Sequence, residues 1–298
     1  MQRTLFEVEE LKRGQPGKPV SPFRLQLLKW IGNKQRFAHE IISYFPDHYG
    51  TYFEPFLGSG AVLGSLAPTS AIASDILKPL TDIWITLKND PDTLKRWYAA
   101  RWRKFMSGDR QVVYERIKES YNRSPSAADL IFLARACYGG VVRFRQADGY
   151  MSTPIGVHQP ITPDSFKRRV DLWRERTSGT TFLHSDFEPV MDQAQAGDVV
   201  YCDPPYVHSQ AILYGAQTFS LERLFHAIAR CKKRGVHVLL SIDGTKKSGQ
   251  HQCRLPIPPG LFERRALVNC GRSMLRRFQM EGEALTQEVV SDRLLLTW

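Results

Sequence analysis

The sequence predicts an α/β protein in which a sheet of parallel type is interrupted by a helical, basic insertion. Two observations carry this prediction. A short apolar segment at 51–55 leads into a glycine-rich turn and a helical pattern, and a second apolar segment at 71–74 ends at Asp75. The strand pattern fades over 80–178, where helical periodicity dominates, and then resumes. Strand, glycine turn, helix, strand and terminal acid are the opening of many parallel sheets that bind nucleotides.

The other elements follow from residue patterns along the chain. Residues 1–21 combine glycines and prolines with charges and predict a loose arm, whereas residues 33–45 have apolar positions at helical spacing. A helix is expected over 221–234, because Ser220 suits an N-cap and Gly235 suits a helix end. Further strands are expected at 180–184, 198–202, 236–242, 267–270 and 293–298.

These elements divide the chain into the arm at 1–21, a sheet domain at 22–88 and 179–298, and the insertion at 89–178. The insertion is basic: residues 91–180 contain 17 Lys+Arg and 9 Asp+Glu, so they hold +8 of the net charge of +11. Aromatic residues lie among these arginines. The concentration of charge predicts that the insertion contacts a polyanion, although basic helix faces often serve only solubility.

Composition excludes several classes of protein. With 298 residues, of which 42% are hydrophobic and 11% aromatic, the chain can bury a large core, and this excludes intrinsic disorder. No apolar run approaches the ~18–20 residues of a membrane span, and the N-terminus lacks a secretory pattern. The five cysteines include no C-x-x-C pair, so neither a zinc site nor a disulfide framework is indicated. We therefore expect a cytoplasmic protein that binds neither a membrane nor a metal.

The glycine-rich turn reads F-E-P-F-L-G-S-G over residues 53–60. Glycines directly after a strand let the backbone approach a ligand closely, and the N-terminus of the following helix favours anionic groups. Asp75 lies 21 residues after Glu54, at the end of the next strand, where a carboxylate can accept both hydroxyls of a ribose. The alternative role for Asp75 is that of a helix N-cap. Together the turn and the acid predict a nucleotide site.

A second polar group follows the apolar strand at 198–202, namely Asp203, Pro204, Pro205 and Tyr206. Two prolines remove two N–H donors and leave carbonyls free to accept hydrogen bonds at the edge of the sheet where α/β proteins bind ligands. Asp203 adds a carboxylate, and Tyr206 adds a flat face for stacking. This collection suits an exocyclic amino group on a flat base, because two acceptors would hold both N–H bonds and aim the nitrogen lone pair at an electrophile.

A third motif, K-W-I-G-N-K at residues 29–34, lies upstream of the sheet. The ordered set of this motif, the turn at 53–60, Asp75 and D-P-P-Y resembles the Dam-type (D12 class) DNA N6-adenine methyltransferases, over about residues 25–298. The resemblance implies that the sheet is a Rossmann-like S-adenosylmethionine-dependent methyltransferase domain and that the insertion at 89–178 is its target-recognition domain. The implied enzyme is site-specific and transfers a methyl group from S-adenosylmethionine to N6 of a flipped adenine in double-stranded DNA.

The same resemblance implies roles around the cofactor. Trp30 and Lys34 match positions near the methionine end of S-adenosylmethionine, and Asp75 matches the acid that binds its ribose. Asp186 lies near the third acidic element of the family. The implied cofactor-binding residues are Trp30, Lys34, Phe53, Glu54, Pro55, Phe56, Gly58, Gly60, Asp75, Asp186 and Asp203.

For the target adenine, the resemblance places Asp203 between the amino group and the cofactor pocket. Pro204 would supply a carbonyl acceptor, and Tyr206 would stack on the flipped base. Ser220 and the segment 241–244 fall where the family completes the target pocket. The implied catalytic residues are Asp203, Pro204, Pro205 and Tyr206.

The insertion departs from the Dam pattern at its expected base-reading segment. Where Dam-like enzymes carry an asparagine-glycine stretch, residues 138–145 read Y-G-G-V-V-R-F-R. Arg143 and Arg145 are candidates to read guanine edges or to contact phosphates, and Tyr138 or Phe144 could wedge into the base stack. These four residues are expected to bind DNA, but no recognition sequence is carried over.

Two other functions stay open on the sequence alone. The motif D-P-P-Y also serves methylation of cytosine N4, although the order of the motifs favours adenine. A nucleic-acid-binding module with a vestigial cofactor pocket is the alternative from another class, and intact Asp75, Lys34 and Asp203 count against it. The expected partner is double-stranded DNA, with a cognate restriction endonuclease as a system partner that need not touch this chain.

Overall fold

The structure is a computed structural model that describes residues 11–13, 16–17, 19–30, 32–145, 147–205, 219–246, 251–252, 257–272 and 289–298. Its strands are β1 (Lys12–Arg13), β2 (Tyr52–Glu54), β3 (Ala71–Asp75), β4 (Thr180–His184), β5 (Val199–Cys202), β6 (His237–Lys246), β7 (His251–Gln252), β8 (Arg264–Arg272) and β9 (Val289–Leu296). Its helices are α1 (Ala38–Ile42), α2 (Ala61–Leu66), α3 (Lys78–Asn89), α4 (Pro91–Ser107), α5 (Arg110–Arg123), α6 (Ala127–Ala136), the 3-10 turn η2 (Tyr138–Gly140), α7 (Pro163–Arg176), α8 (Phe187–Met191) and α9 (Leu221–Lys233). None of the helices in the described ranges combines the length and the apolarity that a membrane span requires.

All of these strands belong to one sheet, in the order β1-β8-β9-β6-β5-β2-β3-β4, with β7 paired to β6. Strands β6, β5, β2, β3 and β4 run parallel, so their carboxyl ends share one edge, while β9 lies antiparallel between β6 and β8. The chain order reverses between β2 and β5, since β3 and β4 extend to one side and β6 extends to the other. Open α/β sheets bind ligands in the crevice at such a reversal.

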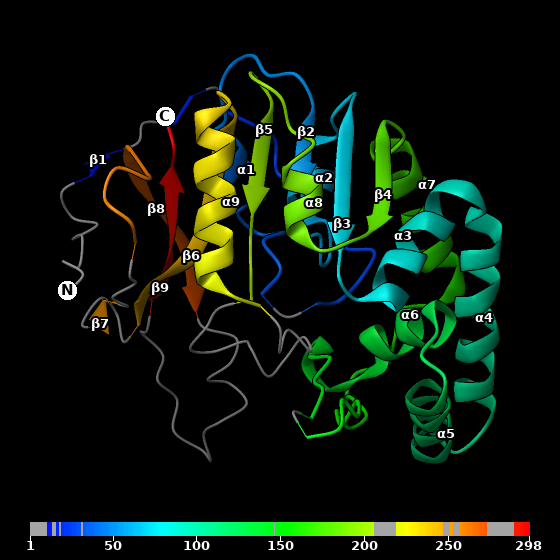
Figure 1. The fold of residues 1–298 in the computed structure, drawn as a ribbon. Coiled ribbons are helices and arrows are strands. Elements are labelled where there is room, and N and C mark those ends of the chain that lie inside the picture. Colours follow the sequence, from blue (N-terminus) through cyan, green and yellow to red (C-terminus); the bar gives the residue numbers. More distant parts are fainter. Residues whose placement is uncertain are drawn as a thin grey trace.

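Side chains that alternate along the strands divide between two apolar cores. In β5, Val199 and Tyr201 join one core, and Val200 and Cys202 join the other. The first core contains the apolar residues of α1, α2 and α3, whereas α8 and α9 cover the second face (Figure 1). Because both faces are covered, a central strand such as β5 is apolar at every position.

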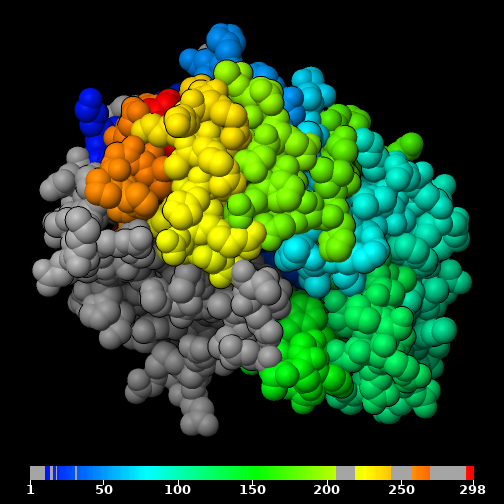
Figure 2. All heavy atoms as spheres, in the orientation of Figure 1, coloured from blue at the N-terminus to red at the C-terminus, as the bar shows by residue number. Residues whose placement is uncertain are grey.

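Helices α4 to α7 form the insertion, whose α5 end extends beyond the carboxyl edge of the sheet (Figure 1). The insertion is a continuous lobe along one side of the molecule, coloured cyan to green in Figure 2. Trp173 of α7 packs on Trp84 of α3, with ring centroids 5.3 Å apart, and a Cβ at Gly64 of α2 would come within 2.4 Å of Trp173. The apolar core therefore continues from the sheet into the insertion, and the domain boundary at 89–178 stays a prediction.

The expected α/β class and the interrupted sheet are confirmed, and the elements differ in detail. The helix expected at 33–45 is only α1, because Asn33 makes a turn: its Nδ2 donates to the Trp30 carbonyl, and its Oδ1 accepts from the Gln35 amide. The expected arm is not entirely loose, since β1 pairs in parallel with β8. Helix α8 has no counterpart in the sequence prediction, because five residues are too few to show helical periodicity.

Candidate functional site

A cavity opens at the carboxyl ends of β2, β3, β4 and β5. Its empty space, open mouth included, is about 990 Å³. All three sequence motifs reach it, although they are far apart in the chain. The predicted site residues that line the cavity are Trp30, Lys34, Glu54, Pro55, Phe56, Gly58, Asp75, Asp186, Asp203 and Pro205.

The floor of the cavity is the glycine turn after β2. Gly58 and Gly60 have φ angles of +49° and +63°, a region that favours glycine. The Gly58 amide donates to Asp75 Oδ2 at 2.9 Å, and its carbonyl accepts from Trp84 Nε1 at 3.2 Å. A Cβ at Gly60 would lie 3.0 Å from the Trp84 ring. The turn is therefore held from two sides, and its bare backbone forms a cradle that a ligand can approach closely.

Asp75 ends β3 and is fixed by backbone donors. Its Oδ1 accepts from the Leu77 amide at 3.0 Å, in addition to the Gly58 bond. Burial raises the pKa of Asp75, while these backbone hydrogen bonds act in the opposite direction. Leu77, and not Asp75, holds the N-cap position of α3, so the alternative N-cap role is not what the geometry shows. Because each carboxylate oxygen has a second lone pair, Asp75 can still accept two hydroxyl donors from a ribose.

Lys34 and Asp203 join two motifs in one ion pair. Lys34 Nζ lies 2.9 Å from Asp203 Oδ1, and their side chains are only 4% and 19% exposed. The same ammonium donates to the Gly32 carbonyl at 3.0 Å. A buried charge is stable only when it is paired and hydrogen-bonded, so Lys34 is part of the pocket and not a solvent-exposed helix residue.

Glu54 lies beside this pair and is buried. Its Oε2 accepts from the Tyr52 hydroxyl at 2.6 Å and from the Leu63 amide at 2.9 Å, and it thereby ties the end of β2 to α2. Burial raises the pKa of Glu54 to about 8, and the nearby Asp203 carboxylate adds to the rise. The pocket thus holds one neutral carboxyl group near neutral pH and, in Asp203, one carboxylate paired with a cation.

Three aromatic rings form the wall near β4. Phe56 stacks on Phe187 with centroids 5.2 Å apart, and Phe219 meets both rings edge-on at 5.9 and 6.1 Å. All three residues line the cavity. Phe187 and Phe219 are absent from the sequence prediction, because a single phenylalanine beside a polar residue does not differ from a core residue by sequence. Their only signal is position: Phe187 follows Asp186 after a strand, and Phe219 precedes the helix cap.

Among the described residues, several predicted ones do not line the cavity. The Phe53 side chain is buried in the core under α8 and α9, and Gly60 shapes the turn. Pro204 is buried, and Ser241 has no exposed surface. Ser220 is the N-cap of α9, because its Oγ accepts from the Arg223 amide at 3.3 Å. Tyr206, the predicted stacking residue, lies outside the described residues.

The four residues expected to bind DNA have different surroundings. Tyr138 is 40% exposed, and Arg143 is also exposed. Arg145 is exposed but pairs with Asp148, with its Nε 3.0 Å from Oδ1. Of the two aromatic candidates, Phe144 is only 7% exposed and packs in the core, whereas Tyr138 lies at the surface.

No cluster of three or more His, Cys, Asp or Glu side chains suited to a metal ion occurs in the described part of the chain. The charged groups of the cavity are instead a cation–carboxylate pair, a fixed acid at the end of β3, and Asp186 after β4. A donor set of this kind suits an organic ligand that carries hydroxyl and amino groups.

Comparison with known proteins finds the same family that the sequence motifs resemble. The family model for the D12 class N6 adenine-specific DNA methyltransferase matches residues 30–252, which is more than half of the chain. The chain is 27% identical over 267 residues to the DNA N-6-adenine-methyltransferase of Escherichia phage P1, covering 85% of this chain but 34% of that protein. It is 28% identical over 231 residues to the Type II methyltransferase M1.LlaDCHI of Lactococcus lactis subsp. cremoris, covering 72% and 79%. It is 26% identical over 235 residues to a DNA adenine methylase of Vibrio cholerae, covering 73% and 81%.

Proposed function

The chain belongs to the D12 class N6 adenine-specific DNA methyltransferase family, and from this premise we propose that it transfers a methyl group from S-adenosylmethionine to N6 of adenine at specific sites in duplex DNA. One observation carries the proposal. The Lys34–Asp203 ion pair, the glycine turn and Asp75 surround one cavity, although they come from three separate motifs. The family does not favour the alternative target, cytosine N4.

The described residues fit the donor. Gly58 has no side chain to keep a ligand away from the turn, Asp75 has lone pairs for ribose hydroxyls, and the aromatic wall offers flat apolar surface to a purine. We propose Trp30 and Lys34 at the methionine end, Asp75 at the ribose, and Asp186 with Phe56 at the purine. When bound, S-adenosylmethionine supplies an activated methyl group on a sulfonium, and no metal is then needed.

The residues of the chain mainly position the target. Asp203 would accept one N–H of the adenine amino group, and the Pro204 carbonyl would accept the other, so that the N6 lone pair points into the cavity. Lys34 holds the Asp203 carboxylate at 2.9 Å, and its positive charge favours the ionised form that accepts hydrogen bonds. The C–N bond forms as the methyl–sulfur bond of the donor breaks and S-adenosylhomocysteine is left, and Asp203 can then accept the proton that the methylated N6 loses. The base must first leave the duplex at a cost of a few kcal/mol, and we propose that Tyr206 stacks on it there.

The insertion is the proposed DNA-binding lobe. It extends beyond the carboxyl edge of the sheet (Figure 1), and its 138–145 segment presents Tyr138 and Arg143 at the surface. We propose that Arg143 and Arg145 contact base edges or phosphates and that Tyr138 fills the stack when adenine is flipped. Lysines and arginines that neutralise phosphates would supply the affinity that does not depend on sequence.

We also propose a cytoplasmic location, where duplex DNA and the donor are both present. One relative is a Type II methyltransferase by name, and this chain can act alone or as the modification half of a restriction system. A restriction endonuclease of the same specificity would meet it only through shared DNA sites.

The decisive experiment uses S-adenosylmethionine with a labelled methyl group and genomic DNA that lacks adenine methylation. We expect label at N6 of adenine within one short sequence, with none at cytosine. Asp203→Ala should give no label. Its matched control is Asp192→Ala, which removes an exposed carboxylate of the α8–α9 contact. Label on cytosine, or equal labelling by Asp203→Ala, would overturn the proposal.

A further inference from the structure

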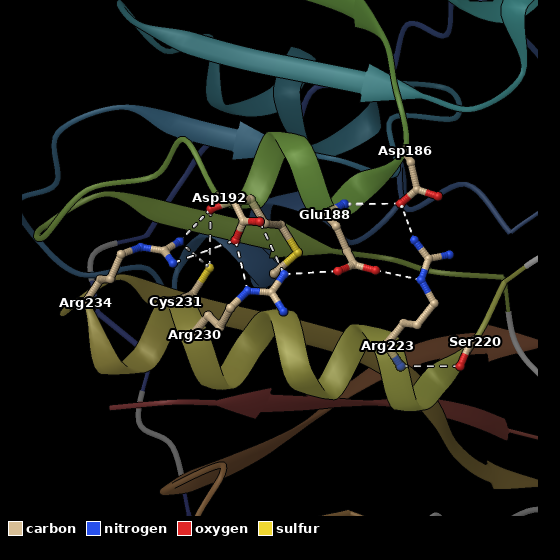
Figure 3. Close-up of polar contacts among 9 residues, drawn as sticks. Asp186, Glu188, Asp192, Ser220, Arg223, Arg230, Cys231 and Arg234 are labelled. Atoms are coloured by element: carbon tan, nitrogen blue, oxygen red, sulfur yellow. Dashed lines mark hydrogen bonds and ion pairs between the residues drawn. The ribbon is translucent and has the colours of Figure 1, made fainter.

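Arg223 of α9 contacts Asp186 and Glu188, which follow β4 (Figure 3). Its Nη2 lies 3.3 Å from Asp186 Oδ1, and its Nε lies 2.6 Å from Glu188 Oε1. Its guanidinium carbon is 5.1 Å from the centroid of the Phe187 ring. Asp186 and Phe187 line the cavity, whereas Arg223 and Glu188 do not. One arginine outside the cavity therefore contacts two consecutive residues of its wall.

The order of the strands indicates which part of the donor meets this wall. Along the carboxyl edge, Asp203 follows β5, the glycine turn follows β2, Asp75 ends β3, and Asp186 follows β4. With methyl transfer at Asp203 and the ribose at Asp75, an extended nucleoside donor places its purine toward β4. The wall that Arg223 contacts is therefore the purine end.

We propose that Arg223 is a positioning residue that orients Asp186 and Phe187 so that the pocket selects a purine with a 6-amino group. This inference rests on the proposed function, because it concerns the same donor site. It gives an exposed arginine of α9, which does not itself line the cavity, a role in the specificity of the pocket.

The hydrogen bonds of Asp186 support this selection. Its Oδ1 accepts from the Glu188 amide at 3.2 Å and from Arg223, and these two donors fix the carboxylate (Figure 3). Its other oxygen accepts no hydrogen bond from the described residues. An ionised carboxylate only accepts hydrogen bonds, so it favours an amino group over a 6-oxo group, which is itself an acceptor.

Phe187 supports the same role. One neighbour of its ring is Phe56, stacked at 5.2 Å, and another is the Arg223 guanidinium. A guanidinium over an aromatic face is attracted by the ring electrons, so the arginine holds the orientation of the ring as well as that of the carboxylate. Loss of Arg223 would loosen both purine contacts without removing either of them.

Arg230, two helical turns further along α9, provides a matched control. The side chains of Arg223 and Arg230 are 43% and 41% exposed, and both pair with Glu188. The second partner of Arg230 is Asp192, at 3.1 Å, and Asp192 does not line the cavity. The two arginines thus contribute similarly to the α8–α9 contact, but only Arg223 touches residues of the pocket.

The test measures ligand binding by calorimetry on the full chain. The ligands are S-adenosylhomocysteine and S-inosylhomocysteine, which differ at the 6-position of the purine. We expect Arg223→Met to raise the Kd for S-adenosylhomocysteine about fivefold, near the upper value for an exposed ion pair. The Kd for S-inosylhomocysteine should change little, so the preference for the 6-amino purine falls by the same factor. Arg223→Lys should restore part of the preference, and Arg230→Met should leave it unchanged while lowering the melting temperature about as much as Arg223→Met.

Two outcomes separate this inference from the proposed function. If the wild-type chain binds S-adenosylhomocysteine and Arg223→Met keeps the full preference, or if Arg230→Met loses it equally, the role of Arg223 is wrong and the donor site stands. If the wild-type chain binds neither ligand and labels no DNA, the proposed function itself fails. In the methylation assay we expect Arg223→Met to raise KM for the donor, with kcat almost unchanged.

Discussion

The carboxyl edge of the sheet and the exposed side of the insertion hold their charged groups in different ways. At the sheet edge, Lys34 and Asp203 are largely removed from water, and Asp75 is held by two backbone donors. On the insertion, cations such as Arg143 and Arg145 are exposed, and Arg145 already pairs with a nearby acid. Buried groups interact strongly and keep one geometry, whereas exposed groups are screened by salt and are individually weak. Single substitutions should therefore have large effects at the sheet edge and small, salt-dependent effects on the insertion.

The largest effect is expected for Asp203→Ala. The substitution removes the acceptor for the target amino group and the partner of Lys34. We expect methyl transfer to fall by at least about 100-fold, as for the loss of a positioned proton acceptor, while the Kd for duplex DNA stays almost unchanged. Single-turnover methylation and a DNA-binding titration check this. If Asp203→Ala weakened DNA binding as much as methyl transfer, the sheet edge and the insertion would not have the separate roles proposed for them.

Next in size is Asp75→Asn, which puts an amide where the carboxylate accepts from Leu77 and Gly58. Hydrogen bonds to charged groups are worth about 1.5–3 kcal/mol, so the Kd for S-adenosylhomocysteine should rise about 10- to 100-fold. Calorimetry measures the change. Asp82→Asn, which removes an exposed carboxylate of α3 that pairs with Lys78, is the control and should bind normally. Equal binding by Asp75→Asn would contradict the ribose assignment.

A smaller effect is expected for Arg143→Ala on the insertion. If Arg143 reads guanine, the variant should lose about 1–3 kcal/mol of discrimination at one base pair, and Arg143→Lys should lose it too, since lysine lacks the planar fork. If Arg143 contacts a phosphate, binding to all sequences should weaken alike, the salt slope should fall by about one, and lysine should restore binding. Titrations at several salt concentrations distinguish the two roles.

The last prediction, for Glu54→Gln, concerns the pH dependence of stability and tests the neutral carboxyl of the pocket. Its pKa is raised from 4.5 to about 8 in the folded chain, so between these values the folded state keeps a proton that the unfolded state has lost. Stability from this group is therefore complete below about pH 4.5 and is lost as the pH rises to about 8. Glutamine cannot titrate, so the variant should lack this decline in stability.

Urea unfolding of wild type and Glu54→Gln at several pH values measures this difference. The single-proton limit is about 1.4 kcal/mol per pH unit. Glu175→Gln, at an exposed position of α7, is the control and should keep the wild-type slope. Parallel profiles for wild type and Glu54→Gln would show that Glu54 is already ionised near neutral pH.

Much of the fold and of the pocket could be predicted because their signals are local. The apolar run of β5 before Asp203, the glycine turn before α2 and the acid at the end of β3 each lie within a few consecutive residues. Parallel strands bring their carboxyl ends to one edge, so the shared location of these motifs follows from topology. The arm and the early helix were harder to predict, because pairing of β1 with β8 and the turn at Asn33 depend on distant or side-chain partners.

The sequence by itself determined the α/β class, the interrupted sheet, the family and the charged residues that line the pocket, since each rests on a short motif or on periodicity. Only the tertiary structure decided that Lys34 pairs with Asp203, that Phe187 and Phe219 complete the wall, that Phe144 is a core residue, and that Arg223 contacts Asp186. The physical reason is distance along the chain. Elements from distant parts of the chain determine a side chain's burial and its charge partner. The residues next to it in the sequence therefore do not predict either property.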